Sequence, residues 1–249
     1  MKTFLLATAF LTRVRVPAND SASEVGRAVR WFPAVGAAIG AAGGLVAWGF
    51  GHVSGMPPLL AALLIVALGA WVTGAIHLDG LADMADGFGG GRSREDVLRI
   101  MRDPRVGSFG AISLILLIAV KVTAIATLIE RGAVTRFLIA APTLSRWTIS
   151  VLGAWLPYAR REGGLGEVVT RQHDSFGLCI ATACAVVVSA LTARWGAVYL
   201  WIVTGLVSAA IGRLALRRIG GVTGDVFGAN LELTETAMLV VAALITDRT

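Results

Sequence analysis

The sequence predicts an all-α, polytopic integral membrane protein with about six or seven transmembrane helices and an acidic, metal-binding cleft on its cytoplasmic side. Hydrophobic residues make up 56% of the chain and charged residues only 15%, whereas a soluble domain usually carries about 25% charged residues. Apolar stretches long enough to cross a bilayer recur along the chain, and aspartates gather where the second stretch ends. No polar segment is long enough to bury a core of its own, so we expect a single membrane-embedded domain over residues 1–249.

The predicted spans follow a short N-terminal segment. That segment, MKTFLLATAFLT, is basic and then apolar, but RVRVP follows it in place of a cleavage site. We therefore expect a helix at the membrane surface and not a removed signal peptide. Six spans are expected at about residues 34–52, 57–76, 109–130, 136–157, 177–193 and 196–214. A seventh, at about 231–245, is short and carries two glutamates at its entry. The glycines of the first span should allow close helix packing.

Basic residues are distributed unevenly between the two ends of these spans. They precede the first span and fill the segments after the second, fourth and sixth, whereas the opposite side receives only Arg131, Arg194 and Arg248. Cytoplasmic loops of membrane proteins carry such an excess. We therefore predict a multi-pass protein with a cytoplasmic N-terminus and all long loops inside. The net charge of +6 is assigned to this topology and not to a nucleic-acid partner.

Three aspartates in regular spacing are the strongest chemical signal. Asp79, Asp83 and Asp86 are four and then three residues apart, so on a helix they share one face. Their charges repel one another, and a hard cation such as Mg²⁺, held by carboxylates together with substrate phosphates, would relieve that repulsion. We predict that these residues are the metal ligands and catalytic groups of a membrane enzyme. The alternative is a solvated helix end that is paired with nearby arginines.

The segment around these aspartates is expected to form two helices. Residues 77–88 should continue the second span, and the glycines at 89–91 should end it. The sequence SRED at 93–96 has the form of a capping box and predicts a new helix that ends before Pro104. On that helix Glu95, Arg99 and Asp103 are spaced by four, which predicts a self-paired stripe. Asp103 and Glu95 could instead complete the metal shell.

A second polar cluster lies in GGVTGDVFGANLELTE, at the entry to the last span. Asp225, Asn230, Glu232 and Glu235 enter an apolar region, where acidic and amide groups are costly and usually functional. We expect them to contact substrate, although the segment also has the chemistry of a helix cap.

Further candidates for substrate contact are isolated cations and one histidine. Lys121 and Arg146 lie near the middles of their spans, where they could pair with carboxylates or receive a phosphate. His77 adjoins the aspartates and could act as a base, a ligand or a helix-end hydrogen-bond partner. Arg102 and Arg160 are weaker candidates, because loop arginines also serve topology.

The pattern DGLADMADG resembles part of the signature of CDP-alcohol phosphotransferases, which are membrane enzymes with clustered aspartates and two metals. Asp83, Asp86 and Gly87 reproduce the D-x-x-D-G core. The Ala-Arg expected next is replaced by GGGR, and the later G-x-x-x-D-x-x-x-D half is absent. The resemblance is therefore partial.

A resemblance to the cobalamin synthase family covers nearly the whole chain. The matching segments are, in order, FLTRVRVP, RAVRWFPAVGAAIG, HLDGLADMADGFGGG, IMRDPRVGSFG, LSRW, PYARREGGLG and GGVTGDVFGANLELTE. MADGF stands where a small or hydroxyl residue is common before Asp86. Order and spacing together make this resemblance more specific than any single motif.

The resemblance implies a reaction and its partners. Such enzymes join α-ribazole, or its 5′-phosphate, to adenosylcobinamide-GDP with Mg²⁺ as cofactor, and they release GMP and adenosylcobalamin or its phosphate. They work in the cytoplasmic (inner) membrane of bacteria, in contact with lipid, and small-residue helix faces would permit a homo-oligomer. A transporter is the main alternative, but no internal repeat stands out. A non-enzymatic scaffold would leave the aspartate face unexplained.

Overall fold

The computed structural model describes residues 2–15, 22–53, 55–160, 163–171 and 175–246, and these residues form a helical bundle. The helices are α1 (Lys2–Leu11), α2 (Ala22–Ala28), η1 (Val29–Trp31), α3 (Phe32–Val53), α4 (Pro58–Thr73), α5 (Ile76–Gly90), α6 (Arg94–Ile100), α7 (Ser108–Glu130), α8 (Val134–Trp155), α9 (Leu165–Arg171), α10 (Ser175–Ala193), α11 (Gly196–Ile219) and α12 (Gly224–Ile245). Among the described residues the only β-type pairing is an isolated bridge between Tyr158 and Val222. The all-α prediction is confirmed.

Six helical segments of the described chain are long and apolar enough to cross a membrane. They are Gly26–Phe50, Ser108–Glu130, Val134–Trp155, Ser175–Ala193, Gly196–Ile219 and Gly224–Ile245. The last of them has 22 residues, so the seventh span, predicted at 231–245, is longer than expected. The second predicted span is instead α4, which has 16 residues and does not qualify alone.

The chain bends by 90° between α4 and α5. Gly74 and Ala75 both adopt left-handed backbone conformations, with φ of 64° and 58°. Glycine reaches this region at low cost and commonly ends helices there, and the Ala75 N–H donates to the Ala70 carbonyl at 2.8 Å. The prediction that residues 77–88 continue the second helix is therefore wrong. The predicted end at the glycine run is confirmed, because α5 ends at Gly90.

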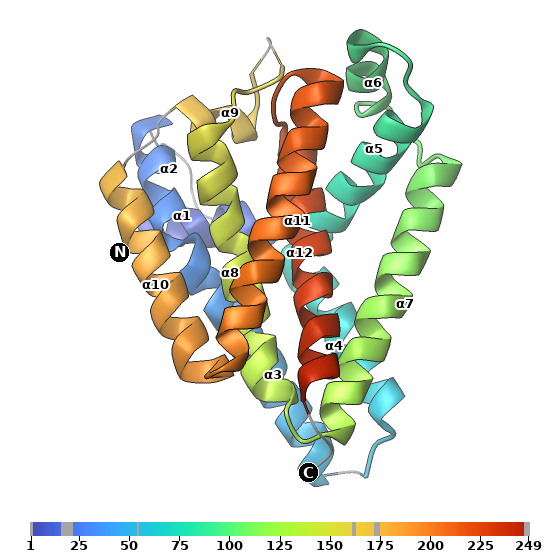
Figure 1. Ribbon diagram of the computed structural model, residues 1–249, viewed down its shortest axis with the longest axis vertical. Coiled ribbons are helices and arrows are strands. Elements are labelled where there is room, and N and C mark those ends of the chain that lie inside the picture. The colour runs from blue at the N-terminus through green and yellow to red at the C-terminus, as the bar shows by residue number, and fades with distance from the viewer. Residues whose placement is uncertain (1, 16–21, 54, 161–162, 172–174, 247–249) are drawn as a thin grey trace.

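Helix α8 occupies the middle of the bundle, and α3 packs closely along it (Figure 1). An added Cβ at Gly36 would lie 2.2 Å from the Pro142 carbonyl oxygen, and one at Gly40 would lie 2.0 Å from that of Leu138. Only glycine permits this approach. Since Pro142 has no N–H, the Leu138 carbonyl has no helical partner from that residue. The predicted packing role of these glycines is confirmed.

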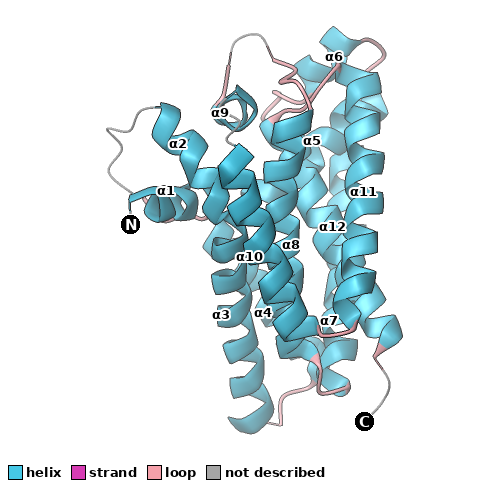
Figure 2. Cartoon of the chain, turned by 60° about the vertical axis from the view of Figure 1, so that its left-hand side comes forward, coloured by secondary structure: helices cyan, strands magenta, loops and turns pink. Residues whose placement is uncertain are grey.

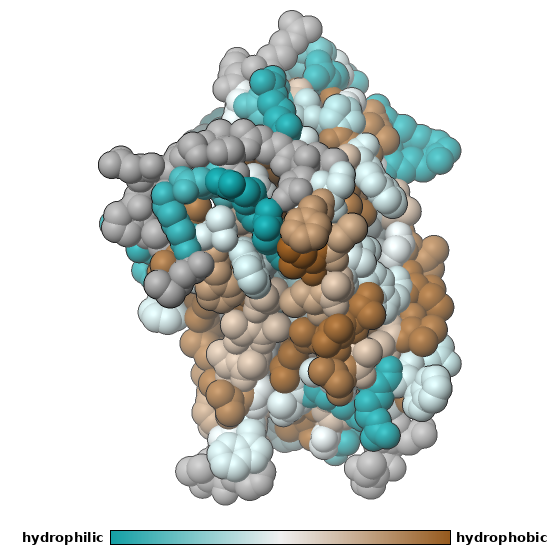
Figure 3. Space-filling model, turned by 90° about the vertical axis from the view of Figure 1, so that its left-hand side faces the viewer, coloured by the Kyte–Doolittle hydropathy of each residue, from teal (hydrophilic) through white to brown (hydrophobic). Residues whose placement is uncertain are grey.

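The polar connections collect at one end of the bundle. Helices α5, α6 and α9 lie at the upper end in Figure 1, whereas the α7–α8 connection and the end of α12 lie toward the lower end. Helix α1, in the segment predicted to form a surface helix, packs beside α2 and α3 (Figure 2). Apolar side chains spread across the middle of the flank in Figure 3, as expected of a surface that meets lipid. The fold thus places the predicted site at the upper end.

Candidate active site

Two of the predicted aspartates lie against the start of α12. Asp79 and Asp83 flank Gly80, and an added Cβ at Gly80 would lie 2.9 Å from the Asp225 carbonyl oxygen. Asp225 is also the acidic group whose charge acts most strongly on Asp83, ahead of Asp79. The structure therefore joins one aspartate of the second predicted cluster to the first. We call Asp79, Asp83 and Asp225 the acidic face.

Asp86 contacts the start of α7. Its Oδ2 accepts a hydrogen bond from the Gly107 N–H at 2.7 Å, and its Oδ1 accepts one from the Gly110 N–H at 2.8 Å. An added Cβ at either glycine would lie within 2.5 Å of the carboxylate oxygens. The carboxylate thus caps α7, whose first N–H groups have no partner within the helix. Sequence reasoning missed this cap, although the glycines that donate to Asp86 stand at both ends of the GSFG sequence at 107–110.

The acidic face fits a cation in its chemistry, although it is not a complete metal shell. Among the described residues no three His, Cys, Asp or Glu side chains are placed to hold a metal ion. Within the same part of the chain the carboxylates of Asp79 and Asp83 accept no hydrogen bond, so their oxygens are available to a hard cation. The assignment of Mg²⁺ to this face stays a prediction.

Arg160 connects the acidic face to the rest of the site. Its Nη2 lies 2.6 Å from Oδ2 of Asp225, and the same nitrogen donates to the Met101 carbonyl at 3.3 Å. The segment that carries Arg160 pairs with the segment before α12, because the Ala159 N–H donates to the Val222 carbonyl at 2.9 Å. This pairing explains why PYARR and GGVTG both belong to the site.

An arginine groove opens beside Arg160. Its volume is about 440 Å³, and its lining residues are Arg94, Glu95, Leu98, Arg99, Arg102, Ala159 and Arg160. Arg94 is held in place by the carbonyls of Ile219 and Ala159, at 2.7 and 2.8 Å. Both predicted loop arginines, 102 and 160, therefore line one groove that suits an anion. Arg94 and Arg99 were not predicted as site residues. The charge of Arg94 was assigned to membrane topology, and Arg99 was assigned to an ion pair within its own helix.

Helix α6 has different ion pairs from those predicted. Ser93 is its N-cap and accepts from the Asp96 N–H at 3.1 Å, as the capping pattern predicts. Arg99 pairs with Asp96 at 2.5 Å, and Asp103 pairs with Arg105 at 2.8 Å. The predicted pairing of Glu95, Arg99 and Asp103 is therefore wrong. Arg99 and Asp103 instead pair with residues three and two positions away in the sequence. The hydrogen bond from Arg105 lowers the pKa of Asp103 to about 2.

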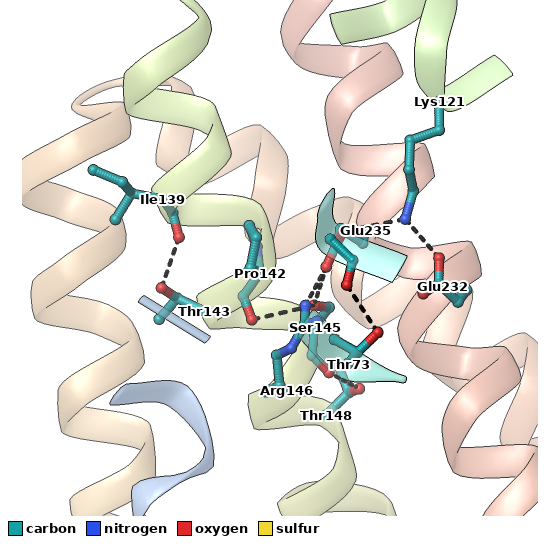
Figure 4. Close-up of polar contacts among 11 residues, drawn as sticks. Thr73, Lys121, Ile139, Pro142, Thr143, Ser145, Arg146, Thr148, Glu232 and Glu235 are labelled. Carbon is teal, nitrogen blue, oxygen red and sulfur yellow. Dashed lines mark hydrogen bonds and ion pairs between the residues drawn. The ribbon is translucent and has the colours of Figure 1, made fainter. Parts of the chain in front are cut away.

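A buried charge network lies deeper in the bundle (Figure 4). The Lys121 ammonium lies 2.5 Å from Oε2 of Glu232 and 3.1 Å from Oε1 of Glu235. Arg146 forms an ion pair with Glu235, and the Ser145 hydroxyl donates to Glu235 at 3.0 Å. Of the two alternatives for the buried cations, pairing with carboxylates is confirmed. Two positive and two negative charges cancel, as burial in low dielectric requires.

His77 and Asn230 are buried between the acidic face and this network. His77 packs against Gly228 of α12, where an added Cβ would lie 3.1 Å from the histidine carbonyl oxygen. The Asn230 amide donates to the Thr148 hydroxyl at 2.8 Å. His77 Nε2 and Asn230 Oδ1 are buried without a hydrogen-bond partner in the described structure. The predicted substrate residues of α12 therefore divide between the acidic face and the bundle interior.

Comparison with known proteins gives consistent matches along the chain. A family model described as cobalamin-5-phosphate synthase matches residues 3–243. A protein of Prosthecochloris aestuarii is 38% identical over 94% of this chain and 94% of its own. One from Pseudomonas aeruginosa is 38% identical over 98% of both chains, and one from Chlorobaculum parvum is 41% identical over 94% of this chain and 92% of its own. All three are named adenosylcobinamide-GDP ribazoletransferase. No solved structure matches this chain.

Proposed function

The chain belongs to the cobalamin-5-phosphate synthase family, and from this premise we propose that it is a Mg²⁺-dependent adenosylcobinamide-GDP ribazoletransferase. A hydroxyl of α-ribazole, or of its 5′-phosphate, attacks the phosphorus next to the cobinamide. The bond from this phosphorus to the bridging oxygen breaks and GMP leaves. The product is adenosylcobalamin or its 5′-phosphate.

One observation carries this proposal: Arg160 contacts the acidic face and also lines the arginine groove. It pairs with Asp225 at 2.6 Å and lines the groove together with Arg94, Arg99 and Arg102. A diphosphate ester needs cationic partners for its phosphate oxygens and carboxylates that can hold its metal ion. The groove supplies the cations and the acidic face supplies the carboxylates, with Arg160 at their junction.

The arginines of the groove and the aspartates of the acidic face have different roles in phosphoryl transfer. The arginines of the groove orient the diphosphate and neutralise charge on the leaving GMP. Asp79 and Asp83, whose oxygens accept no protein hydrogen bond in the described structure, would hold Mg²⁺. A bound Mg²⁺ supplies Lewis-acid stabilisation of the phosphoryl oxygens. The proton of the attacking hydroxyl passes to a carboxylate of the acidic face that does not hold the cation.

The placement of the site supports a cytoplasmic-membrane setting with the site on the inner side. The acidic face and the groove lie at the end of the bundle that carries α5, α6 and α9 (Figure 1). This end contains the arginine-rich segments that sequence assigns to the cytoplasm. We propose that the protein resides in the bacterial cytoplasmic membrane with this end inside, so that nucleotide substrates reach the site from the cytosol.

The test measures GMP release and corrinoid product from adenosylcobinamide-GDP and α-ribazole phosphate, in detergent, with Mg²⁺ or with EDTA. Turnover should require Mg²⁺, and Asp79→Asn and Asp83→Asn should each lower kcat by about 100-fold or more. Glu130→Gln is the matched control, because Glu130 is an exposed carboxylate at the far end of α7. Its kcat should equal that of the wild-type protein.

Two results would count against this function. Well-folded protein that gives no product under any metal condition would leave transport, or phosphotransfer with another nucleotide-activated substrate, as the better reading. Equal turnover in EDTA and in Mg²⁺ would remove the metal from the mechanism.

A further inference from the structure

A cavity of about 110 Å³ lies inside the bundle between α3, α4, α7, α8 and α12. Most of its wall is apolar, with side chains such as Ile65, Leu117 and Leu138. Its polar wall is formed by the buried charge network, including Arg146 and Glu235. The volume is of the order of the roughly 150 Å³ engineered cavity that admits benzene. The space therefore suits the end of a flat aromatic group.

The charge state of the polar wall restricts the ligand further. Lys121 is paired with Glu232 and Glu235, and Arg146 is paired with Glu235. Because the two cations are matched by two carboxylates, an incoming phosphate would have to displace a buried carboxylate, which is costly. The cavity is therefore suited to an uncharged ligand.

Arg146, a residue of this wall, has one polar atom without a partner. Nε of Arg146 is buried and makes no hydrogen bond in the described structure, and the residue is only 3% exposed. The Nε–H group can only donate, and a buried donor without an acceptor costs free energy. A neutral aromatic ligand with one acceptor atom at its polar edge would satisfy this donor.

The cavity reaches α5, the helix that carries Asp79 and Asp83 of the acidic face. Leu78 lines it and directly precedes Asp79. On α12, Glu232 follows Asp225 by seven residues, which corresponds to about 10 Å along the helix axis. A nucleoside is comparable in length, so a single molecule could place its sugar at the acidic face and its base in the cavity.

We propose that this cavity receives the aromatic base of the acceptor nucleoside and that Arg146 Nε donates to the free nitrogen of its ring. The proposal rests on the proposed function. The base of α-ribazole is a benzimidazole, which is flat, uncharged and apolar except for the one ring nitrogen that is not bonded to ribose. Arg146 is thereby a specificity-determining residue, and the ribose hydroxyl is directed toward Asp79 and Asp83.

The first test fills the cavity. An added Cβ at Gly43 meets Ile65 and Leu138, both lining residues, at an ordinary 3.9 Å, so a larger side chain can enter without a backbone clash. Gly43→Leu should raise the KM for α-ribazole by about tenfold or more and leave the KM for adenosylcobinamide-GDP unchanged. Gly49→Leu is the matched control on the same helix, because Gly49 has open space around it and does not line the cavity.

The second test removes the acceptor atom from the ligand. The α-riboside of indole has the shape of the benzimidazole riboside but a C–H group in place of the free ring nitrogen. Wild-type protein should prefer the benzimidazole riboside by about 10- to 100-fold in kcat/KM. Arg146→Lys keeps the positive charge beside Glu235 but has no Nε, so it should lose most of this preference.

Binding of α-ribazole by isothermal titration calorimetry separates this proposal from the proposed function. Wild-type protein that binds α-ribazole more tightly than Gly43→Leu supports the cavity even if turnover fails. Turnover with the same KM for α-ribazole in wild-type and Gly43→Leu protein overturns the cavity proposal and leaves the function intact. A phospholipid found by native mass spectrometry in wild-type protein but not in Gly43→Leu, with no change in α-ribazole binding, also overturns it.

Discussion

Asp86 lies in the same helical register as Asp79 and Asp83 of the acidic face, yet its carboxylate contacts a different helix. Both of its oxygens accept backbone N–H groups at the start of α7, at 2.7 and 2.8 Å. Asp79, seven residues earlier on the same helix, is exposed. Spacing alone could not distinguish these aspartates, because the N–H groups that Asp86 caps belong to glycines more than twenty residues later in the chain.

The two aspartates should respond differently to removal of the carboxylate. Asp86→Ala should lower the free energy of unfolding by about 1–2 kcal/mol, because the first N–H groups of α7 lose their acceptor. Asp79→Ala should change it by less than about 0.5 kcal/mol. Denaturant unfolding in detergent, followed by circular dichroism, measures both. Equal destabilisation by the two variants would contradict the capping role.

The candidate site shows how far residue patterns can predict chemistry. The sequence identified Asp79 and Asp83 from their spacing and identified Asp225 as part of a separate cluster. Only the packing of Gly80 on α12 brings Asp225 beside them, and no local pattern encodes that contact. Arg94 was missed for a similar reason, since its partners at Ile219 and Ala159 are distant in sequence.

At the scale of elements, the bend between α4 and α5 decides where the aspartates lie. A hydropathy profile detects where apolar residues are, but it does not detect a change of direction between two helical segments. The one local signal is Gly74, since glycine after a helix often adopts the left-handed conformation that ends it. Ala75 adopts the same conformation, which the identity of an alanine does not predict.

The bend predicts opposite effects of two neighbouring substitutions. Gly74→Ala should lower the free energy of unfolding by about 1 kcal/mol, because a Cβ is strained at a φ of 64°. Ala75→Gly should raise it by about 0.5 kcal/mol, since relief of the same strain exceeds the added entropy of the unfolded chain. An added Cβ at Gly74 meets Arg13 only at 3.5 Å, so a clash does not confuse the comparison.

Thermal unfolding of both variants in one detergent provides the measurement. A loss of stability in both would indicate that the turn is held by contacts and not by backbone preference.

At the scale of the molecule, composition predicted the membrane class and the charge pattern predicted the orientation. The predicted number of spans was close, but their identity changed: α4 is too short to cross alone, and α12 is complete. The last helix had been underestimated because its first turns carry Asp225, Asn230 and Glu232, which lower the hydropathy. Those residues are tolerated because each has a partner: Lys121 of α7 pairs with Glu232, Thr148 of α8 accepts from Asn230, and Arg160 pairs with Asp225.

Orientation can be tested with single cysteines. In a background with Cys179 and Cys184 replaced by alanine, Glu95→Cys on α6 and Glu130→Cys at the end of α7 place thiols at opposite ends of the bundle. A membrane-impermeant maleimide should label position 130 in intact cells and position 95 only in inverted vesicles. The reverse pattern would put the candidate site outside the cytoplasm and would contradict its proposed supply of nucleotides.

The dependence of α5 on α12 also has a consequence for biosynthesis. Helix α5 packs more extensively against α12 than against any other helix, and α12 follows α5 in the described chain by more than 130 residues. During translation, the aspartate helix therefore emerges from the ribosome well before its main packing surface exists. The site can be completed only after α12 has inserted, so a nascent chain that lacks α12 cannot be active.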